Sequence, residues 1–405
     1  MRCRLVLLFI ALATPAWAQV AELDLRTTFF LEPSADSELV VITPAAALSV
    51  TPVEGFGVTA GWEADIVTGA SERVKAGPLV DVVTSATSFS DVRHVASLGF
   101  TLTRENTRLS AAGSYGIEND YRSRAISVAA STDFLQKNTQ IELSYGHGFD
   151  EVCTTAFRSA DSPTLRTPLD SSAGCFQKNA DDRATRDVSL ENFQTAWTQA
   201  WTPVFETQLV LTGAVQSGFL ANPYRSVVIG PAGDEALEHH PEHRARGAAA
   251  VRGRYYVRPL ATAFGLGVRV YRDTWDVFSH TWELEAERYL SSWLRILIRG
   301  RFYEQTGALF FSDDYTGGEP LLGPRGQYFT GDRELSPLHS FLLGGRLRAA
   351  WTGAPGDRVG GALLKLEASA GVDVLKTDLE EFTWSGEEPN DTIAFIPSVG
   401  LSGAF

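Results

Sequence analysis

The chain has 405 residues, of which 44% are hydrophobic and 21% charged, and its 35 basic and 49 acidic side chains give a formal net charge of −14. The apolar content excludes a disordered chain, and the lack of a compositional repeat excludes a collagen-like one. Nucleic-acid binding is excluded as well, because the phosphate backbone requires a clustered cationic surface. Length alone favours two or three soluble domains.

The first residues have the features of a secretory signal. Arg2 and Arg4 form a positive start, Leu5–Leu12 is an unbroken apolar run, and Ala16-Trp17-Ala18 places small residues at the −3 and −1 positions of a cleavage site. The run is too short to span a bilayer. We therefore predict a signal peptide over residues 1–18; the alternatives are a membrane anchor or a buried N-terminal helix.

The cysteine positions agree with export. Cys3 precedes the apolar run, whereas a lipid-attachment cysteine would follow it. Cys153 and Cys175 lie in one polar stretch, and two such cysteines in an exported chain most often form a disulfide. A metal or redox pair is the alternative, but the spacing fits neither.

Further along the chain, hydrophobic side chains alternate with polar ones. In 340–351, for example, Phe341, Leu343 and Leu347 share one face and Arg346 and Arg348 the other. Alternation over about ten residues indicates strand, not helix. We predict sixteen strands, at 23–31, 38–50, 55–67, 92–103, 107–117, 122–133, 139–149, 188–201, 204–217, 245–257, 261–273, 278–290, 293–304, 338–351, 360–374 and 392–405. Fourteen or eighteen strands are the alternatives, because 23–31 and 72–91 are ambiguous.

The links between these strands differ in length in a regular way. Every long link follows an odd-numbered strand. These links are 68–91, 150–187, 218–244, 305–337 and 375–391. In an up-and-down arrangement they all lie at one end, as in bacterial outer-membrane barrels with short periplasmic turns and long external loops.

The end of the chain supports the same fold. Phe405 closes a strand in which Leu401 and Val399 alternate with small residues, which is typical of the signal that the barrel assembly machinery recognises. In hydrocarbon an unpaired backbone amide costs several kcal/mol, so the sheet must close on itself. We therefore predict one transmembrane antiparallel up-and-down β-barrel of about sixteen strands as the single domain, residues 19–405.

Charged rows on the polar face indicate the nature of the lumen. An Arg on the lipid face costs roughly 2–4 kcal/mol at the midplane, so these rows should face inward. The predicted lumen residues are Arg244, Arg246, Arg252, Arg254, Glu283, Glu285, Glu287, Arg295, Arg299, Arg301, Arg346 and Arg348. The Glu row and the Arg row of neighbouring strands should pair. Such a lining can select hydrated solutes, or it can be a self-neutralising wall that stiffens the barrel.

Several segments carry a family resemblance. DIVTGAS at 65–71 recurs as DVVTSAT at 81–87. Further segments are FSDVRHVASLGFTL at 89–102, NPYRSV at 222–227, RVYRDTWDVFSHTWELE at 269–285, RGRFYEQTGALFFSDDY at 299–315 and GDRELSPLHS at 331–340. Together they resemble a family of uncharacterised bacterial outer-membrane β-barrels, a domain of unknown function. The resemblance implies the fold and the location, and no substrate. Asp65 and Asp81 could fold the first long loop inward, or the repeat could be a plain turn.

Candidate chemistry in the loops is sparse. His239, His240 and His243 in HHPEH could take a metal, but a solvated loop is the favoured interpretation. The loop acids could bind Ca²⁺ or Mg²⁺ at the outer leaflet, and here too solvation is favoured. These acids are Asp313, Asp314, Glu319, Asp332 and Glu334. No cofactor is predicted. His147 and His280 have no suitable nucleophile, so no catalytic residue is predicted and we do not expect an enzyme.

The function predicted from the sequence is porin-like passive or facilitated transport of small hydrated solutes. The alternative is a structural or surface-interaction barrel with an occluded pore, and an outer-membrane enzyme is remote. The expected location is the outer membrane of a Gram-negative bacterium, after cleavage near Ala18. Expected partners are outer-membrane lipid, lipopolysaccharide and, through Phe405, the barrel assembly machinery.

Overall fold

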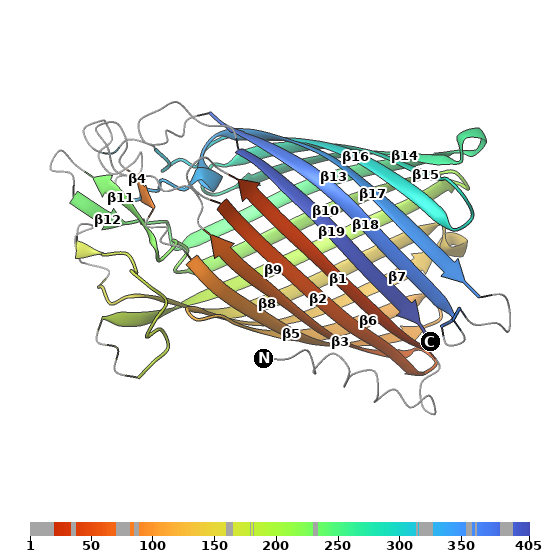
Figure 1. The fold of residues 1–405 in the computed structure, drawn as a ribbon, viewed down its shortest axis with the longest axis horizontal. Coiled ribbons are helices and arrows are strands. Elements are labelled where there is room, and N and C mark those ends of the chain that lie inside the picture. The colour runs from red at the N-terminus through yellow and green to blue at the C-terminus, as the bar shows by residue number, and fades with distance from the viewer. Residues whose placement is uncertain are drawn as a thin grey trace.

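The computed structural model describes residues 20–33, 38–69, 82–84, 89–158, 165–178, 180, 182–229, 234–312, 315, 327–353, 359–360, 363–380 and 392–405. Sixteen strands form one closed antiparallel barrel (Figure 1). They are β1 (Val20–Pro33), β2 (Glu38–Val53), β3 (Phe56–Gly69), β5 (Phe89–Arg104), β6 (Thr107–Ile117), β7 (Tyr121–Phe134), β8 (Thr139–Thr155), β9 (Arg183–Thr202), β10 (Phe205–Gly218), β13 (His243–Val257), β14 (Thr262–Asp273), β15 (Phe278–Tyr289), β16 (Leu294–Gln305), β17 (Leu338–Thr352), β18 (Lys365–Leu379) and β19 (Thr392–Ala404). The predicted fold is confirmed.

The barrel closes between its first and last strands. β1 pairs antiparallel with β19, with Leu25 opposite Leu401. Phe405, one residue beyond β19, extends the seam, since its N–H donates to the Ala21 carbonyl at 2.8 Å. Closure pairs the two strand edges that an open sheet would leave unpaired, which is what a hydrocarbon environment requires.

The sorting of loops by length is also confirmed. The last strand, β19, finishes on the same side of the barrel as the short turns, while the long links lie on the opposite side (Figure 1). In the two-residue turn 54–55, Gly55 has φ +80°, and a Cβ there would lie 2.5 Å from the Thr103 carbonyl oxygen. Three strands differ from their predicted bounds by five residues or more. β8 ends at Thr155, not 149, and β9 begins at Arg183, not 188. β18 spans Lys365–Leu379, not 360–374, so the preceding link 353–364 is longer than expected.

A second, three-stranded sheet lies at the loop end, which we call the mouth (Figure 1). Its order is β12-β11-β4, with β4 at Val82–Thr84, β11 at Arg225–Ile229 and β12 at Asp234–Leu237. Sequence patterning did not predict it, because strands this short show no measurable alternation. Short 3₁₀ turns occur at Leu135–Lys137, Arg258–Leu260 and Arg333–Leu335.

The barrel sheet has two chemically distinct faces. On the apolar face, large hydrophobic side chains are exposed on strand after strand, including Phe100, Leu143, Leu211, Leu284, Ile298, Leu343 and Val399. On the other face, which we call the polar face, charged residues align in register. Arg252 of β13 and Glu283 of β15, for example, both lie opposite Gly267 of β14. An apolar band of this extent suits lipid, not water.

Aromatic side chains gather near the turn end. The rings of Trp293 and Trp351 stack with centroids 5.9 Å apart, and those of Trp197 and Trp201 meet at 6.2 Å. Such residues favour the membrane interface. Tyr289, at the turn end of β15, lies on the face that carries Arg295, whose guanidinium is 5.5 Å from the Tyr289 ring centroid. Within the described ranges, no helix has the length and apolar character needed to cross a bilayer.

Candidate functional site: a charged barrel face and a folded mouth

The structure places all twelve predicted lumen residues on the polar face. β13 contributes four arginines, β15 three glutamates, β16 three arginines and β17 two arginines, each at alternate positions. The strand registers align them, since Arg252 is opposite Gly267, which is opposite Glu283, which is opposite Arg301. The alternation read from the sequence therefore assigned these residues to one common face.

Ion pairs join many of these side chains, often across an intervening strand. Arg252 Nη2 lies 2.9 Å from Glu283 Oε2, passing over Gly267 of β14. Glu287 accepts from Arg254 of β13 and from Arg295 of β16, whose Nη1 lies 3.2 Å from Glu287 Oε1. Reaching over a strand is possible because the residue between is glycine or alanine.

The expected pairing between the Glu row of β15 and the Arg row of β16 holds only for Glu287 and Arg295. Arg299, which is opposite Glu285 in the register, pairs with Asp373 of β18 instead. Arg348 pairs with Glu367 of β18, with 3.2 Å between Nε and Oε1. The site thus includes acids that the prediction of lumen residues did not contain: Asp273, Glu367 and Asp373.

Some charges on this face have no ionic partner. Among the described residues, Glu285, Arg301 and Arg346 take part in no ion pair, and neither do Arg246 and Arg269. An unpaired guanidinium keeps its full field, whereas a paired one is largely neutralised. The charges of these unpaired arginines are therefore the least neutralised on the polar face.

Charge is unevenly distributed around the barrel. On the polar face of the arc β13–β18, the described side chains comprise eleven Arg or Lys and six Asp or Glu. On the polar face of the other ten strands there are four Arg and nine Asp or Glu. The net charges of the two arcs are therefore opposite in sign, which sets up a field across the barrel.

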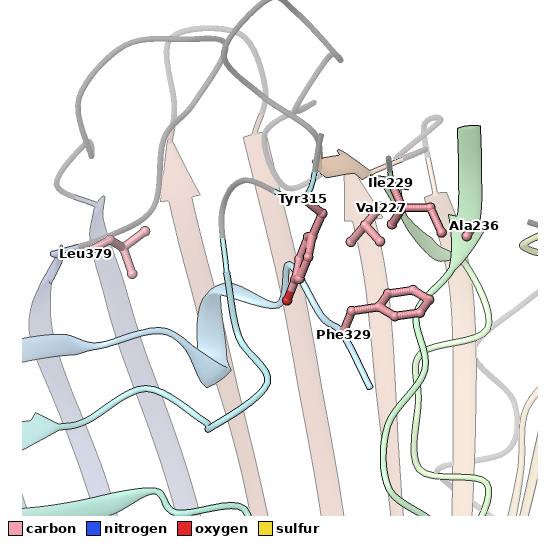
Figure 2. Close-up of a cluster of buried hydrophobic side chains, with 6 residues drawn as sticks. All are labelled: Val227, Ile229, Ala236, Tyr315, Phe329 and Leu379. Carbon is pink, nitrogen blue, oxygen red and sulfur yellow. The ribbon is translucent and has the colours of Figure 1, made fainter. Parts of the chain in front are cut away.

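At the mouth, three long links fold together. We call the described parts of 156–182, 219–242 and 306–337 the mouth assembly. Its apolar centre consists of Val227 and Ile229 of β11, Ala236 of β12, Tyr315, Phe329 and, from the barrel, Leu379 (Figure 2). Tyr315 and Phe329 are fully buried. A second cluster of Trp275, Val277, Ala308, Phe310 and Leu335 continues the packing.

Backbone pairing joins the three links. His239 and Phe329 exchange N–H···O bonds of 3.1 and 3.0 Å, which ties 219–242 to 306–337. The Leu169 amide donates to the Pro223 carbonyl at 2.7 Å, which ties 156–182 to 219–242. The mouth assembly is therefore a folded unit, not a set of independent loops.

A buried carboxylate holds the centre of the mouth assembly. Glu238 is 2% exposed, and its Oε1 accepts from Thr330 Oγ1 and from the Gly331 amide, each at 3.0 Å. Its Oε2 lies 3.4 Å from His240 Nε2 and 3.9 Å from Arg225 Nη1. Buried carboxylates persist only where hydrogen bonds and opposite charge offset their desolvation.

The same network reaches the barrel wall. Arg225 Nη1 lies 2.6 Å from Asp332 Oδ2, and Asp332 Oδ1 accepts from the Glu334 amide at 3.0 Å. The next residue, Arg333, lies in the link between β16 and β17. Its Nη1 lies 3.0 Å from Oε1 of Glu32, which belongs to β1. Four strand positions separate β16 from β1 around the barrel. Segment 327–337 therefore extends across the mouth.

Charged groups of the mouth assembly have shifted pKa values. Burial acts to lower the pKa of Arg225, but the carboxylates of Glu238 and Asp332 outweigh it, and the pKa is raised. Burial, helped by the nearby Arg166 charge, lowers the pKa of His239 from its ordinary 6.5. Burial and the Asp332 charge raise the pKa of Glu334 above its ordinary 4.5.

The Cys153–Cys175 disulfide is present, with 5.8 Å between the Cα atoms. It ties the end of β8 to the link 156–182, the fourth of the eight links at the mouth. Both cysteines pack with the buried Leu169 and with Phe176 and Tyr224. The disulfide therefore anchors the first of the three links of the mouth assembly.

The histidines of HHPEH diverge in the structure. His239 Nδ1 contacts the Gln327 carbonyl at 2.7 Å and His240 Nδ1 the Leu220 carbonyl at 3.0 Å, while His243 begins β13. Within the described ranges, no three His, Cys, Asp or Glu side chains are grouped in a way that could hold a metal. Of the loop acids and Asp65 and Asp81 singled out above, Asp81, Asp313, Asp314 and Glu319 lie outside the described residues.

The remaining residues singled out in the sequence, Asp65, His147 and His280, each lie near an oppositely charged or hydrogen-bonding side chain. Asp65 accepts from Thr43 Oγ1 at 2.8 Å and lies 3.9 Å from Arg93. His147 lies 3.9 Å from Glu191, and His280 lies 3.6 Å from Glu304. The residues that sequence reasoning missed, above all Glu238 and Arg225, lie in loops where no periodic pattern marks them.

The closed sheet, its lipid-compatible apolar face and its charged polar face define an outer-membrane β-barrel. The chain belongs to the DUF3570 family of proteins of unknown function, whose family model matches residues 40–344. No curated protein matches it.

Among solved structures, the chain is similar in fold to a bacterial polysaccharide outer membrane secretin, at 9% identity over 95% of this chain and 98% of the other, with a TM-score of 0.49. It is also similar to Pseudomonas aeruginosa OccK3 (OpdO), at 8% identity over 95% of each chain and a TM-score of 0.41. For Pseudomonas aeruginosa OpdQ the identity is 9%, over 95% and 98% of the two chains, and the TM-score is 0.43.

Proposed function

We propose that the protein is an outer-membrane channel that passes small hydrated solutes through a charged lumen lined by the polar face. The observation that carries the proposal is the set of polar-face arginines without ionic partners, Arg246, Arg269, Arg301 and Arg346, on the net-positive arc. A wall built only for stiffness would neutralise its charges, as Arg299 and Asp373 do. Unpaired charges along a channel attract and orient solutes.

Conductance of the purified barrel in planar lipid bilayers tests this proposal. We expect stepwise openings, and a reversal potential in a KCl gradient that depends on the arginines. Replacing Arg299 and Arg301 with Ser removes two positive charges and frees Asp373, so selectivity shifts towards cations. Folded protein without any stepwise conductance would refute the channel, and an unchanged reversal potential would refute the role of this row.

A second candidate function is a structural or surface-interaction barrel with an occluded pore. The mouth assembly favours it, because segment 327–337 extends across the mouth and packs through buried side chains such as Phe329. The same bilayer recording separates the two functions, since an occluded barrel stays silent. A variant that undocks the mouth assembly would then open it.

We also propose that residues 1–18 direct export and are removed, and that Phe405 is recognised by the barrel assembly machinery in a Gram-negative host. In the outer membrane, the apolar face would contact lipid and the mouth lipopolysaccharide. Edman sequencing of the membrane-extracted protein should begin at Gln19. Deleting Phe405 should reduce assembled barrel severalfold, measured as the heat-modifiable band in electrophoresis; an unchanged band would contradict this role.

A further inference from the structure

One cavity lies on the polar face where β7–β10 meet β13 and β14. Its volume is about 440 Å³. None of the residues that line it is acidic. The lining includes the polar side chains of Ser144, Asn192, Gln194, Thr212, Arg246 and Arg269.

Small residues create this space. Gly146 of β8, Ala214 of β10 and Ala248 of β13 line the cavity with almost no side chain. Ala248 is opposite Tyr271 in the register, and Ala214 is opposite Arg246. The longer side chains around this gap therefore have room to converge on a guest. A volume of this size is within the range of small-molecule sites.

The two arginines of the cavity are the distinctive feature. Arg246 donates from Nη2 to Gln216 Oε1, and its Nε is buried without a hydrogen-bond partner. The Arg269 guanidinium lies 5.5 Å from the Tyr271 ring centroid. Neither forms an ion pair with any described carboxylate.

The nearest acid on β14 is already engaged. Asp273 accepts from Arg244 Nε at 2.8 Å and from Tyr271 Oη at 2.7 Å. Asp273 therefore forms its ion pair with Arg244, whereas Arg246 and Arg269 form none with the described carboxylates. This differs from Arg252, Arg254 and Arg299, each of which forms an ion pair with a carboxylate.

A bound anion would supply the negative charge that Arg246 and Arg269 lack among the residues lining the cavity. Guanidinium groups bind carboxylates through paired, charge-assisted hydrogen bonds. The amides of Asn192 and Gln194 and the hydroxyls of Ser144 and Thr212 both donate and accept, as sugar-like hydroxyls require. The lining thus combines a cationic part with a neutral part that can bind hydroxyl groups.

We propose that this cavity is a binding subsite for a small carboxylate that also carries hydroxyl groups. The proposal rests on the proposed channel function, because the solute would reach Arg246 and Arg269 through the lumen. The subsite would concentrate such anions in the barrel and slow their passage. Neutral polyols of the same size would bind only through the neutral part of the lining.

Gluconate and sorbitol form a matched pair of probes, since both have six carbons and hydroxyl groups and only gluconate has a carboxylate. Titration calorimetry of the detergent-solubilised barrel should show gluconate binding at least tenfold tighter than sorbitol. In planar bilayers, millimolar gluconate should produce brief blockades of the open current. Equal binding of the two probes would overturn the assignment, as would phosphate binding tenfold tighter than gluconate.

Two double variants with the same loss of charge locate the subsite. R246Q/R269Q should weaken gluconate binding at least tenfold. R26Q/R108Q removes two arginines from the polar face of β1 and β6 that do not line the cavity, and should change the affinity less than twofold. An equal loss in both variants would mean that net lumen charge, not the cavity, attracts the anion.

Failure of this proposal is distinguishable from failure of the channel. Stepwise conductance without gluconate blockade or heat would retain the channel and overturn the subsite. Gluconate binding to a silent barrel would retain the subsite and overturn conduction. Both double variants should keep the heat-modifiable electrophoretic band of the folded barrel, which excludes misfolding as the cause of a lost signal.

Discussion

Arg299 and Asp373 form a two-point ion pair across an intervening strand. Arg299 Nε lies 3.0 Å from Asp373 Oδ1, and Nη2 lies 2.7 Å from Oδ2. Gly344 of β17 stands between them in the register. A Cβ at Gly344 would lie 1.7 Å from Asp373 Oδ1, so this ion pair requires glycine.

Gly344→Ala should therefore weaken the barrel. The new methyl group displaces the Asp373 carboxylate and breaks the two-point pair, at a cost of about 1 kcal/mol once the partial exposure of Arg299 is allowed for. The measurement is the temperature at which the heat-modifiable band disappears in electrophoresis. Gly267→Ala is the matched control, because its Cβ meets Glu283 Oε2 at an ordinary 3.6 Å. Equal loss in both variants would contradict this account.

The same ion pair shows what the sequence could and could not predict. Alternation placed Arg299 and Asp373 on the polar face, because side-chain direction in a strand has period two. It could not predict their contact, since that depends on the registers of both β16 with β17 and β17 with β18. The prediction that the rows of neighbouring strands pair therefore holds for Glu287 and Arg295. It did not include the ion pair between Arg299 and Asp373.

The contacts of the mouth assembly could not be predicted from the sequence for a different reason. Arg333 and Glu32 are 301 positions apart, and nothing local marks them as partners. Glu238 directly precedes HHPEH, and this buried carboxylate, not the histidines that suggested a metal site, organises the local structure. In loops, contacts depend on tertiary packing and not on periodicity, so their residues cannot be assigned from alternation.

Glu238→Ala should undock segment 327–337. The substitution leaves Thr330 and Gly331 without their acceptor and Arg225 with one carboxylate fewer, at a cost of about 3 kcal/mol. Trypsin should then cut after Arg333 in intact outer membranes, as identified by mass spectrometry. Glu242→Ala, at an exposed position of the same link, should leave the bond uncut. Equal cleavage in wild type and variant would contradict the docking role.

Reducing the Cys153–Cys175 disulfide should loosen the link 156–182 without unfolding the barrel. A crosslink that closes a loop of 22 residues is worth about 3 kcal/mol in the chain-entropy treatment. Hydrogen exchange at the Leu169 amide, which donates to the Pro223 carbonyl, should accelerate in dithiothreitol. The amide of Ile141, near the start of β8 and at the turn end of the barrel, serves as the internal control. Unchanged exchange at Leu169 would show that packing alone holds the link.

Acidification should weaken the pairing between His239 and Phe329. Burial and Arg166 lower the pKa of His239, so the folded state favours the neutral ring. The stabilisation that neutral His239 gives to the folded mouth assembly is fully present above the ordinary pKa of 6.5. It is lost as the pH falls through the lowered pKa of the folded state. Glu334 acts in the opposite direction: its raised pKa favours the folded mouth below 4.5, and that contribution is lost as the pH rises through the raised value.

Hydrogen exchange at the Phe329 amide, which donates to the His239 carbonyl, measures this effect. After correction for intrinsic rates, its protection should fall as the pH drops below 6.5. His239→Gln keeps a polar side chain facing the Gln327 carbonyl but does not titrate, so the decline in this range should vanish. A decline that persists unchanged in His239→Gln would overturn the assignment of the effect to His239.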